Sequence, residues 1–123
     1  MANLIEEIES WGRQERAQLR NRVSILIGNL LKWEYQSNRR SRSLLMMIHI
    51  SRRDVLELLA ENPSLKAYLP ECLQKSYQKG VFLAARETNL PIKTFPPDSC
   101  YSLDEILRDR FYPGETAADD LME

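Results

Sequence analysis

Apolar side chains recur every three or four positions along the first part of the chain, a spacing that aligns them on one face of an α-helix. The pattern predicts one long helix over residues 2–36. It forms two runs, one of Leu4, Ile8 and Trp11 and one of Leu19, Val23, Leu26, Leu30 and Trp33. A polar stretch, residues 12–18, separates the runs, and Gly12 within it weakens a helix by about 1 kcal/mol relative to alanine. We therefore expect a bend or a shift of the apolar face there.

The same spacing predicts a second helix from residue 39 or 40 to residue 61, and a helical region from residue 64 to residue 88. Asn62 and Pro63 should end the second helix and begin the next region, because asparagine favours cap positions and proline suits the first position of a helix. Pro70 lacks an N–H group and should separate a short leading segment, residues 64–69, from the third helix. The expected core stripes are Leu45, Ile48, Val55, Leu56 and Leu59 in the second helix, and Leu73, Tyr77, Val81 and Ala84 or Ala85 in the third, where Gly80 is a weak point.

Residues 89–101 contain three prolines and no helical period, so we expect an extended segment that holds Leu90, Ile92 and Phe95 against the helices. Ser102 and Glu105 have the spacing of a capping box and predict a short last helix over residues 102–110. Residues 115–123 have the composition of a flexible acidic tail. The sequence thus predicts a single all-α domain over residues 1–114, an antiparallel helical bundle with a long first helix, two further main helices and a short C-terminal helix.

Charge is balanced over the whole chain but not along it. The 123 residues carry 17 Lys or Arg and 18 Asp or Glu, a net charge of −1, so no overall field attracts nucleic acid or a membrane. Residues 32–53 hold six basic side chains against Glu34 alone, whereas residues 98–123 are strongly acidic. We expect these oppositely charged ends to meet, within one chain or across a dimer.

The cysteines and the apolar runs restrict the compartment. Cys72 and Cys100 have neither a Cys-x-x-Cys nor a Cys/His spacing, so we expect two free thiols in a reducing compartment, the cytoplasm, and neither a metal nor a cofactor. The longest apolar run, residues 44–48, is far too short to cross a bilayer, and the first residues do not have the pattern of a signal peptide.

Five segments form motifs that follow one another along nearly the whole chain. They are NLIEEIESWGRQER (3–16), LLKWEYQSNRRSRS (30–43), NPSLKAYLPECL (62–73), AARETNLPIKTFP (84–96) and YSLDEIL…FYPGE (101–115). Together they resemble the bacterial family called Domain of Unknown Function 29, which is abundant in cyanobacteria. The resemblance implies a small all-helical fold and no established activity.

Two departures from the family pattern concern exposed surfaces. Members usually carry an additional amphipathic segment before the motif at residues 3–16, whereas this chain starts almost at the motif. Residues 44–53 are also more apolar than the Arg-rich helix of the family, and between Leu44 and Ile50 only His49 is not apolar. A helix that is apolar all round needs cover on several sides. If the leading helix is absent, its docking surface is bare, and we expect a second copy or a partner to cover it.

Arg42 and His49 are the candidates for catalysis. They stand seven residues apart, two turns along one helix face, and resemble the Arg/His pair of HEPN-type ribonucleases, which are also small helical bundles and commonly act as dimers. An HEPN-like ribonuclease or RNA-binding module is therefore the alternative function. Because His49 lies in an apolar run, a histidine at a core or interface position is the favoured interpretation.

A basic and aromatic cluster is the candidate interaction surface. It comprises Trp33, Tyr35, Arg39, Arg40, Arg42, Leu44, Met47 and Arg53. Arginines can bind phosphates and aromatic rings can stack on bases. Pairing of the arginines with acids of the first helix or the tail is the favoured interpretation, protein binding comes next, and nucleic acid is the least favoured partner.

The glutamates Glu6, Glu7 and Glu9 do not complete a metal site, because no histidine or second acidic pair is placed beside them. Since no catalytic set is evident, the leading hypothesis is a non-enzymatic protein–protein interaction module, one that self-associates or binds a protein partner.

Overall fold

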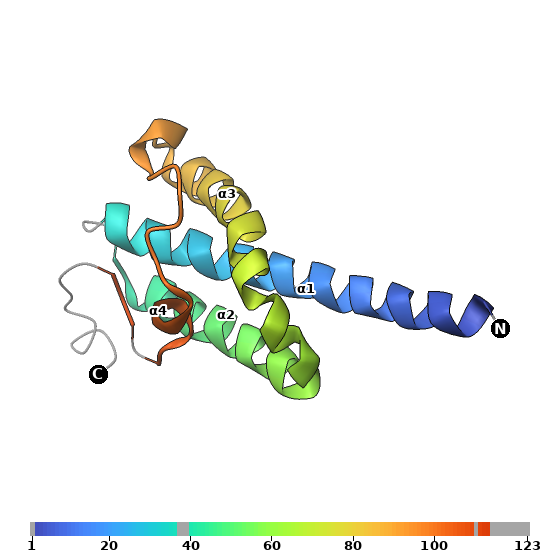
Figure 1. Cartoon of the computed structure of the whole chain (residues 1–123). Coiled ribbons are helices and arrows are strands. Elements are labelled where there is room, and N and C mark those ends of the chain that lie inside the picture. Colours follow the sequence, from blue (N-terminus) through green and yellow to red (C-terminus); the bar gives the residue numbers. More distant parts are fainter. Residues whose placement is uncertain (1, 37–39, 110, 114–123) are drawn as a thin grey trace.

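The computed structural model describes residues 2–36, 40–109 and 111–113, with side chains from residue 12 onward (Figure 1). Over these residues it contains helices and no strand. In chain order they are α1 (Ala2–Tyr35), α2 (Arg42–Glu61), the 3₁₀ helix η2 (Pro63–Tyr68), α3 (Leu69–Thr88), the 3₁₀ helix η3 (Ile92–Thr94) and α4 (Leu103–Leu107). The predicted all-α fold with a long first helix and a short last helix is confirmed. The predicted acidic tail, residues 115–123, lies outside the described residues.

The helices pack around the C-terminal part of α1. Figure 1 shows α2 running antiparallel to α1, α3 crossing α1 obliquely, and α4 beside α2. The N-terminal end of α1 projects beyond the ends of the other helices. None of the described helices has the combination of length and apolar character that would let it cross a membrane.

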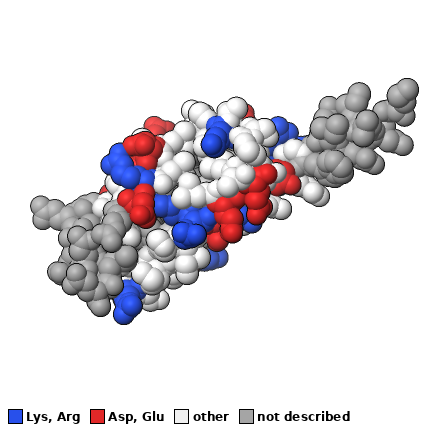
Figure 2. Space-filling model, turned by 90° about the horizontal axis from the view of Figure 1, so that it is seen from below, with Lys and Arg blue, Asp and Glu red and all other residues white. Residues whose placement is uncertain are grey.

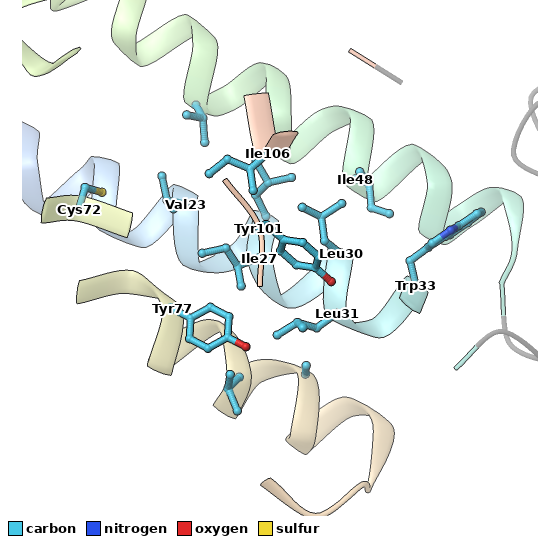
Figure 3. Close-up of a cluster of buried hydrophobic side chains, with 14 of the residues drawn as sticks. Val23, Ile27, Leu30, Leu31, Trp33, Ile48, Cys72, Tyr77, Tyr101 and Ile106 are labelled. Carbon is cyan, nitrogen blue, oxygen red and sulfur yellow. The ribbon is translucent and has the colours of Figure 1, made fainter. Parts of the chain in front are cut away.

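The core lies where α1, α2, α3 and the C-terminal segment converge. Figure 3 shows side chains from all four meeting there, among them Ile27, Leu30, Ile48, Tyr77, Tyr101 and Ile106. Every residue of the second apolar run predicted in α1, from Leu19 to Trp33, is buried. The three-and-four spacing therefore identified the core face of α1 correctly.

Local side-chain chemistry sets the helix ends. Ser41 caps α2 by accepting a hydrogen bond from the Leu44 N–H at 3.1 Å, so α2 begins at Arg42 rather than at residue 39 or 40. Pro70 stands in the first turn of α3, where a missing N–H costs nothing. Asn89 ends α3 with φ at 59°, a left-handed conformation that asparagine tolerates well.

Several local predictions are wrong. α1 passes through Gly12 as one uninterrupted helix without a bend (Figure 1), so of the two expectations for residues 12–18 only the shift of the apolar face stays a prediction. Leu56, expected in the core stripe of α2, is 42% exposed. Ile92, expected to be held against the helices, is 51% exposed, whereas Phe95 is buried as predicted. The capping box of Ser102 and Glu105 is present, but α4 ends at Leu107 because the backbone becomes extended at the next residue.

Candidate interaction surface

The aromatic residues of the predicted interaction cluster lie inside the fold. Trp33 is completely buried, and its ring centroid lies 5.5 Å from that of Tyr112. Tyr35 is half-buried and packs edge-on against Phe95, with 5.2 Å between the ring centroids. A partner could not contact Trp33 without opening the fold, so both rings anchor the end of α1.

Of the described arginines in the cluster, one makes contacts within the fold and two are exposed. Arg40 donates from Nε to the Trp33 carbonyl oxygen at 2.8 Å and lies over the Trp33 ring, with Cζ 5.0 Å from its centroid. Arg42 and Arg53 are exposed, and within the described part of the chain neither forms an ion pair with a carboxylate. Arg39 lies outside the described residues. Arg40 thus secures the corner between α1 and α2 through a main-chain carbonyl and a ring.

Arg52, the most deeply buried of the described arginines, is absent from the predicted interaction cluster. Arg52 is only 2% exposed, and it donates from Nε to the Ile106 carbonyl oxygen and from Nη2 to the Phe111 carbonyl oxygen, both at 2.8 Å. Burial lowers the pKa of Arg52, and the nearby Tyr112 and Asp109 partly oppose that shift. A signal was available, because Arg52 stands four residues after Ile48 and therefore falls in the core stripe of α2.

Arg42 and His49 share a face of α2 but no cavity described here. Arg42 is exposed and His49 is half-buried, and neither lines any of the better-formed cavities among the described residues. On the face shown in Figure 2, basic and acidic side chains are interspersed with uncharged ones rather than separated. Nor does any group of three His, Cys, Asp or Glu side chains among the described residues have the arrangement of a metal site. The face shown in Figure 2 therefore has no continuous basic patch among its described residues that could follow a phosphate backbone.

A groove on the surface of α1 is the clearest candidate for binding. Its first part, about 370 Å³, is lined by α1, α2 and α3 through Asn21, Ile25, Gly28, Asn29, Met47, Lys79, Leu83, Arg86 and Glu87. A second cavity of about 240 Å³ shares Met47 and Glu87 with the first and adds Lys32, Gln36, Ser41, Ser43 and Leu44. We call the two together the α1 groove. Over residues 21–36 it is roughly 22 Å long at 1.5 Å per residue.

The α1 groove combines apolar walls with a basic rim. Ile25 and Met47 are 41% and 43% exposed, a large fraction for apolar side chains that face each other across a groove. On the α3 side, Lys79 donates to Asn21 Oδ1 at 3.0 Å, and Arg86 lies 3.7 Å from Glu87, which also pairs with Lys32. Three basic side chains against one acid make the rim positive. Of the predicted interaction residues, Leu44 and Met47 line this groove.

Another cavity, about 760 Å³, lies between α3 and the segment before α4. Its buried tyrosines make internal hydrogen bonds: Tyr77 donates to the Pro96 carbonyl oxygen at 2.8 Å, and Tyr101 donates to Glu34 Oε1 at 3.2 Å. Burial raises the pKa of both hydroxyls, and the charge of Glu34 raises each further. Both therefore remain protonated and serve as donors within the fold rather than as acid–base groups.

Comparison with known proteins places the chain in a family without assigning it an activity. No curated protein and no solved structure matches the sequence. One family model, described as a domain of unknown function, matches residues 1–112 and thus nearly the whole chain. The resemblance noted in the sequence is therefore confirmed, and the protein belongs to the family DUF29.

Proposed function

We propose that the protein is a non-enzymatic interaction module that self-associates through the α1 groove. The observation that supports this most directly is the pair Ile25 and Met47, apolar side chains left more than 40% exposed on facing walls. Full burial of such a side chain contributes about 1.5–3 kcal/mol, so covering both would contribute roughly 2 kcal/mol to association.

The proposal places the module in a reducing bacterial cytoplasm. Cys72 is buried and Cys100 is exposed, and both are free thiols. Proteins of oxidising compartments commonly use cysteines in disulfides instead.

Two variants of α2 test the proposal by sedimentation velocity at micromolar concentration. Met47→Glu would place a carboxylate in the covered groove and should weaken self-association at least tenfold, about 1.4 kcal/mol. Leu56→Glu is the matched control, because Leu56 is 42% exposed but lies outside the α1 groove. A wild-type protein that stays monomeric, or equal effects of the two variants, would contradict the proposal.

The alternative, a ribonuclease using Arg42 and His49, requires both side chains in one groove that also admits RNA. Incubation of the wild-type protein and His49→Ala with single-stranded and structured RNA separates the two functions. Cleavage that depends on His49 would support the ribonuclease, and RNA binding should then weaken steeply with salt. An apolar interface would respond to salt much less.

A further inference from the structure

We propose that the α1 groove is filled by the N-terminal end of α1 from a second copy of the chain, so that two α1 helices pack antiparallel. This inference rests on the proposed self-association and names what occupies the groove. It follows from the length of α1, the register of its side chains and the charges on both surfaces.

The two parts of α1 have matching lengths. α1 has 34 residues, about 51 Å of helix, and among its described side chains, from residue 12 onward, Leu19 is the first that is buried. The preceding residues, 2–18, form roughly 25 Å of helix, and Figure 1 shows this end projecting beyond α2 and α3. A segment of that length is long enough to extend along most of a groove of about 22 Å. The groove of one copy can therefore accept the projecting end of another.

The register of α1 joins the projecting end and the groove in a single stripe. Steps of four and three residues connect Leu4, Ile8, Trp11, Glu15, Gln18, Arg22, Ile25 and Asn29. This repeat of 3.5 residues is the one that keeps two helices in contact in a coiled coil. The stripe is apolar at residues 4–11, and Ile25 and Asn29 at its other end line the α1 groove.

Antiparallel pairing brings the isoleucines of the two stripes together. Reading one stripe backwards against the other sets Ile8 opposite Ile25, Leu4 opposite Asn29 and Trp11 opposite Arg22. The two-fold axis then falls between Glu15 and Gln18. In this register residues 2–12 of each copy lie over residues 21–31 of the other, so the isologous arrangement covers the first part of both grooves at once.

The walls of the groove match the flanks of the incoming helix. The flanks are the positions on either side of the contact stripe, and in an antiparallel pair each flank of one helix meets the same flank of the other. Gly28 lies on the α3 side of α1, where a Cβ atom would come within 3.2 Å of Leu83 Cβ. Glu7 stands 21 residues before Gly28, six steps of the 3.5-residue repeat, and so holds the same flank position in the sequence. That flank would meet the basic rim of Lys79 and Arg86. Residues 2–11 contain three glutamates and no basic residue, which complements the positive groove.

Disulfide trapping of the full chain tests this arrangement. In a Cys100→Ser background, the double variant Ile8→Cys/Ile25→Cys should form a covalent dimer under mild oxidation, because the opposed Cα atoms would lie within disulfide range. A bond within one chain is excluded, since the two positions are about 25 Å apart along one uninterrupted helix. Ile8→Cys/Glu57→Cys is the control, because Glu57 is exposed on α2 and does not line the groove.

The possible results separate this inference from the proposed function. Covalent dimers that form at least tenfold faster with Ile25→Cys than with Glu57→Cys would support it. Self-association of the wild type without this preference would overturn the antiparallel arrangement but leave the α1 groove as an interface of another kind. A wild-type chain that is monomeric at all concentrations would overturn both.

A charge exchange gives a second, independent measurement. Glu7→Lys and Lys79→Glu should each weaken the dimer roughly two- to fivefold, the range expected for exposed ion pairs. Combining the two substitutions should restore the affinity, since the pair is then reversed. Additive weakening in the combined variant would contradict the proposed contact.

Discussion

Gly28 and Gly80 set the distance between α1 and α3 at the point where these helices cross. A Cβ atom on Gly80 would lie 2.6 Å from Ile27 Cγ2 and 2.9 Å from Ile27 Cβ, both much closer than van der Waals contact. The sequence alone identifies Gly80 only as a residue that weakens its helix. In the structure its missing side chain is what lets α3 approach α1 closely. The same close approach shapes the floor of the α1 groove, since Gly28 lines it.

The variant Gly80→Ala should lower the free energy of unfolding, although alanine favours a helix by about 1 kcal/mol over glycine. Overpacking of this kind costs about 1–3 kcal/mol, because neither the branched Ile27 side chain nor the backbone can move away freely. Gly12→Ala is the matched control: its nearest contact would be Arg16 Nη2 at 3.9 Å, so it should stabilise the protein by up to about 1 kcal/mol. Urea unfolding measures both, and stabilisation by Gly80→Ala would contradict the packing argument.

Also at the residue scale, the predicted set of core residues is wrong where the polarity of a side chain disagrees with its position on the helix. Leu56 is apolar but falls outside the stripe of Ile48 and Val55, and it is exposed. Arg52 is charged but falls inside that stripe, and it is buried because carbonyl oxygens of the C-terminal segment receive its hydrogen bonds. Position along the helix was the better guide in both cases. The carbonyl partners of Arg52 could not be inferred, since they lie more than 50 residues away.

At the scale of elements, the C-terminal segment depends on α2 for its position. The described residues of this segment, 95–109 and 111–113, contain only the short helix α4, so few of their own backbone hydrogen bonds hold them in place. Arg52 supplies two hydrogen bonds to their carbonyl oxygens, and Tyr101 adds one to Glu34 of α1. The long helices and the capping box were predictable from local pattern. The position of this segment was not, because distant residues determine it.

Arg52→Met should loosen the C-terminal segment more than the rest of the fold. Methionine retains the apolar stem but leaves the Ile106 and Phe111 carbonyl oxygens without their donor, at a cost of about 1–3 kcal/mol. Hydrogen exchange should become faster for the amides of residues 106–112, with smaller changes in α1. Arg53→Met is the control, because Arg53 is exposed and should alter neither. Equal effects of the two variants would show that the buried hydrogen bonds do not hold the segment.

At the scale of the whole molecule, the fold was easier to predict than the surface. Three helices build the α1 groove, and its α1 wall contains Asn21, Asn29 and Lys32, which give no apolar signal in the sequence. The predicted cluster included two groove residues, Leu44 and Met47, because the apolar run of α2 exceeds what one core face can bury. It could not identify the facing residue Ile25, since that pairing exists only after α1 and α2 have packed.

The stability of the protein at alkaline pH is a property of the whole fold, because the buried tyrosines reach solvent only when the core unfolds. The pKa values of Tyr77 and Tyr101 are raised above the usual 10.0, mainly by burial, so the folded protein keeps both protons where the unfolded chain loses them. Their contribution is fully present below about pH 10 and is lost as the pH rises further. The free energy of unfolding should therefore fall above pH 10, by up to about 1.4 kcal/mol per pH unit for each tyrosine. Urea unfolding across this range measures the slope, and Tyr77→Phe/Tyr101→Phe should flatten it even though the variant is less stable at neutral pH. An unchanged slope in the double variant would mean that other groups govern alkaline unfolding.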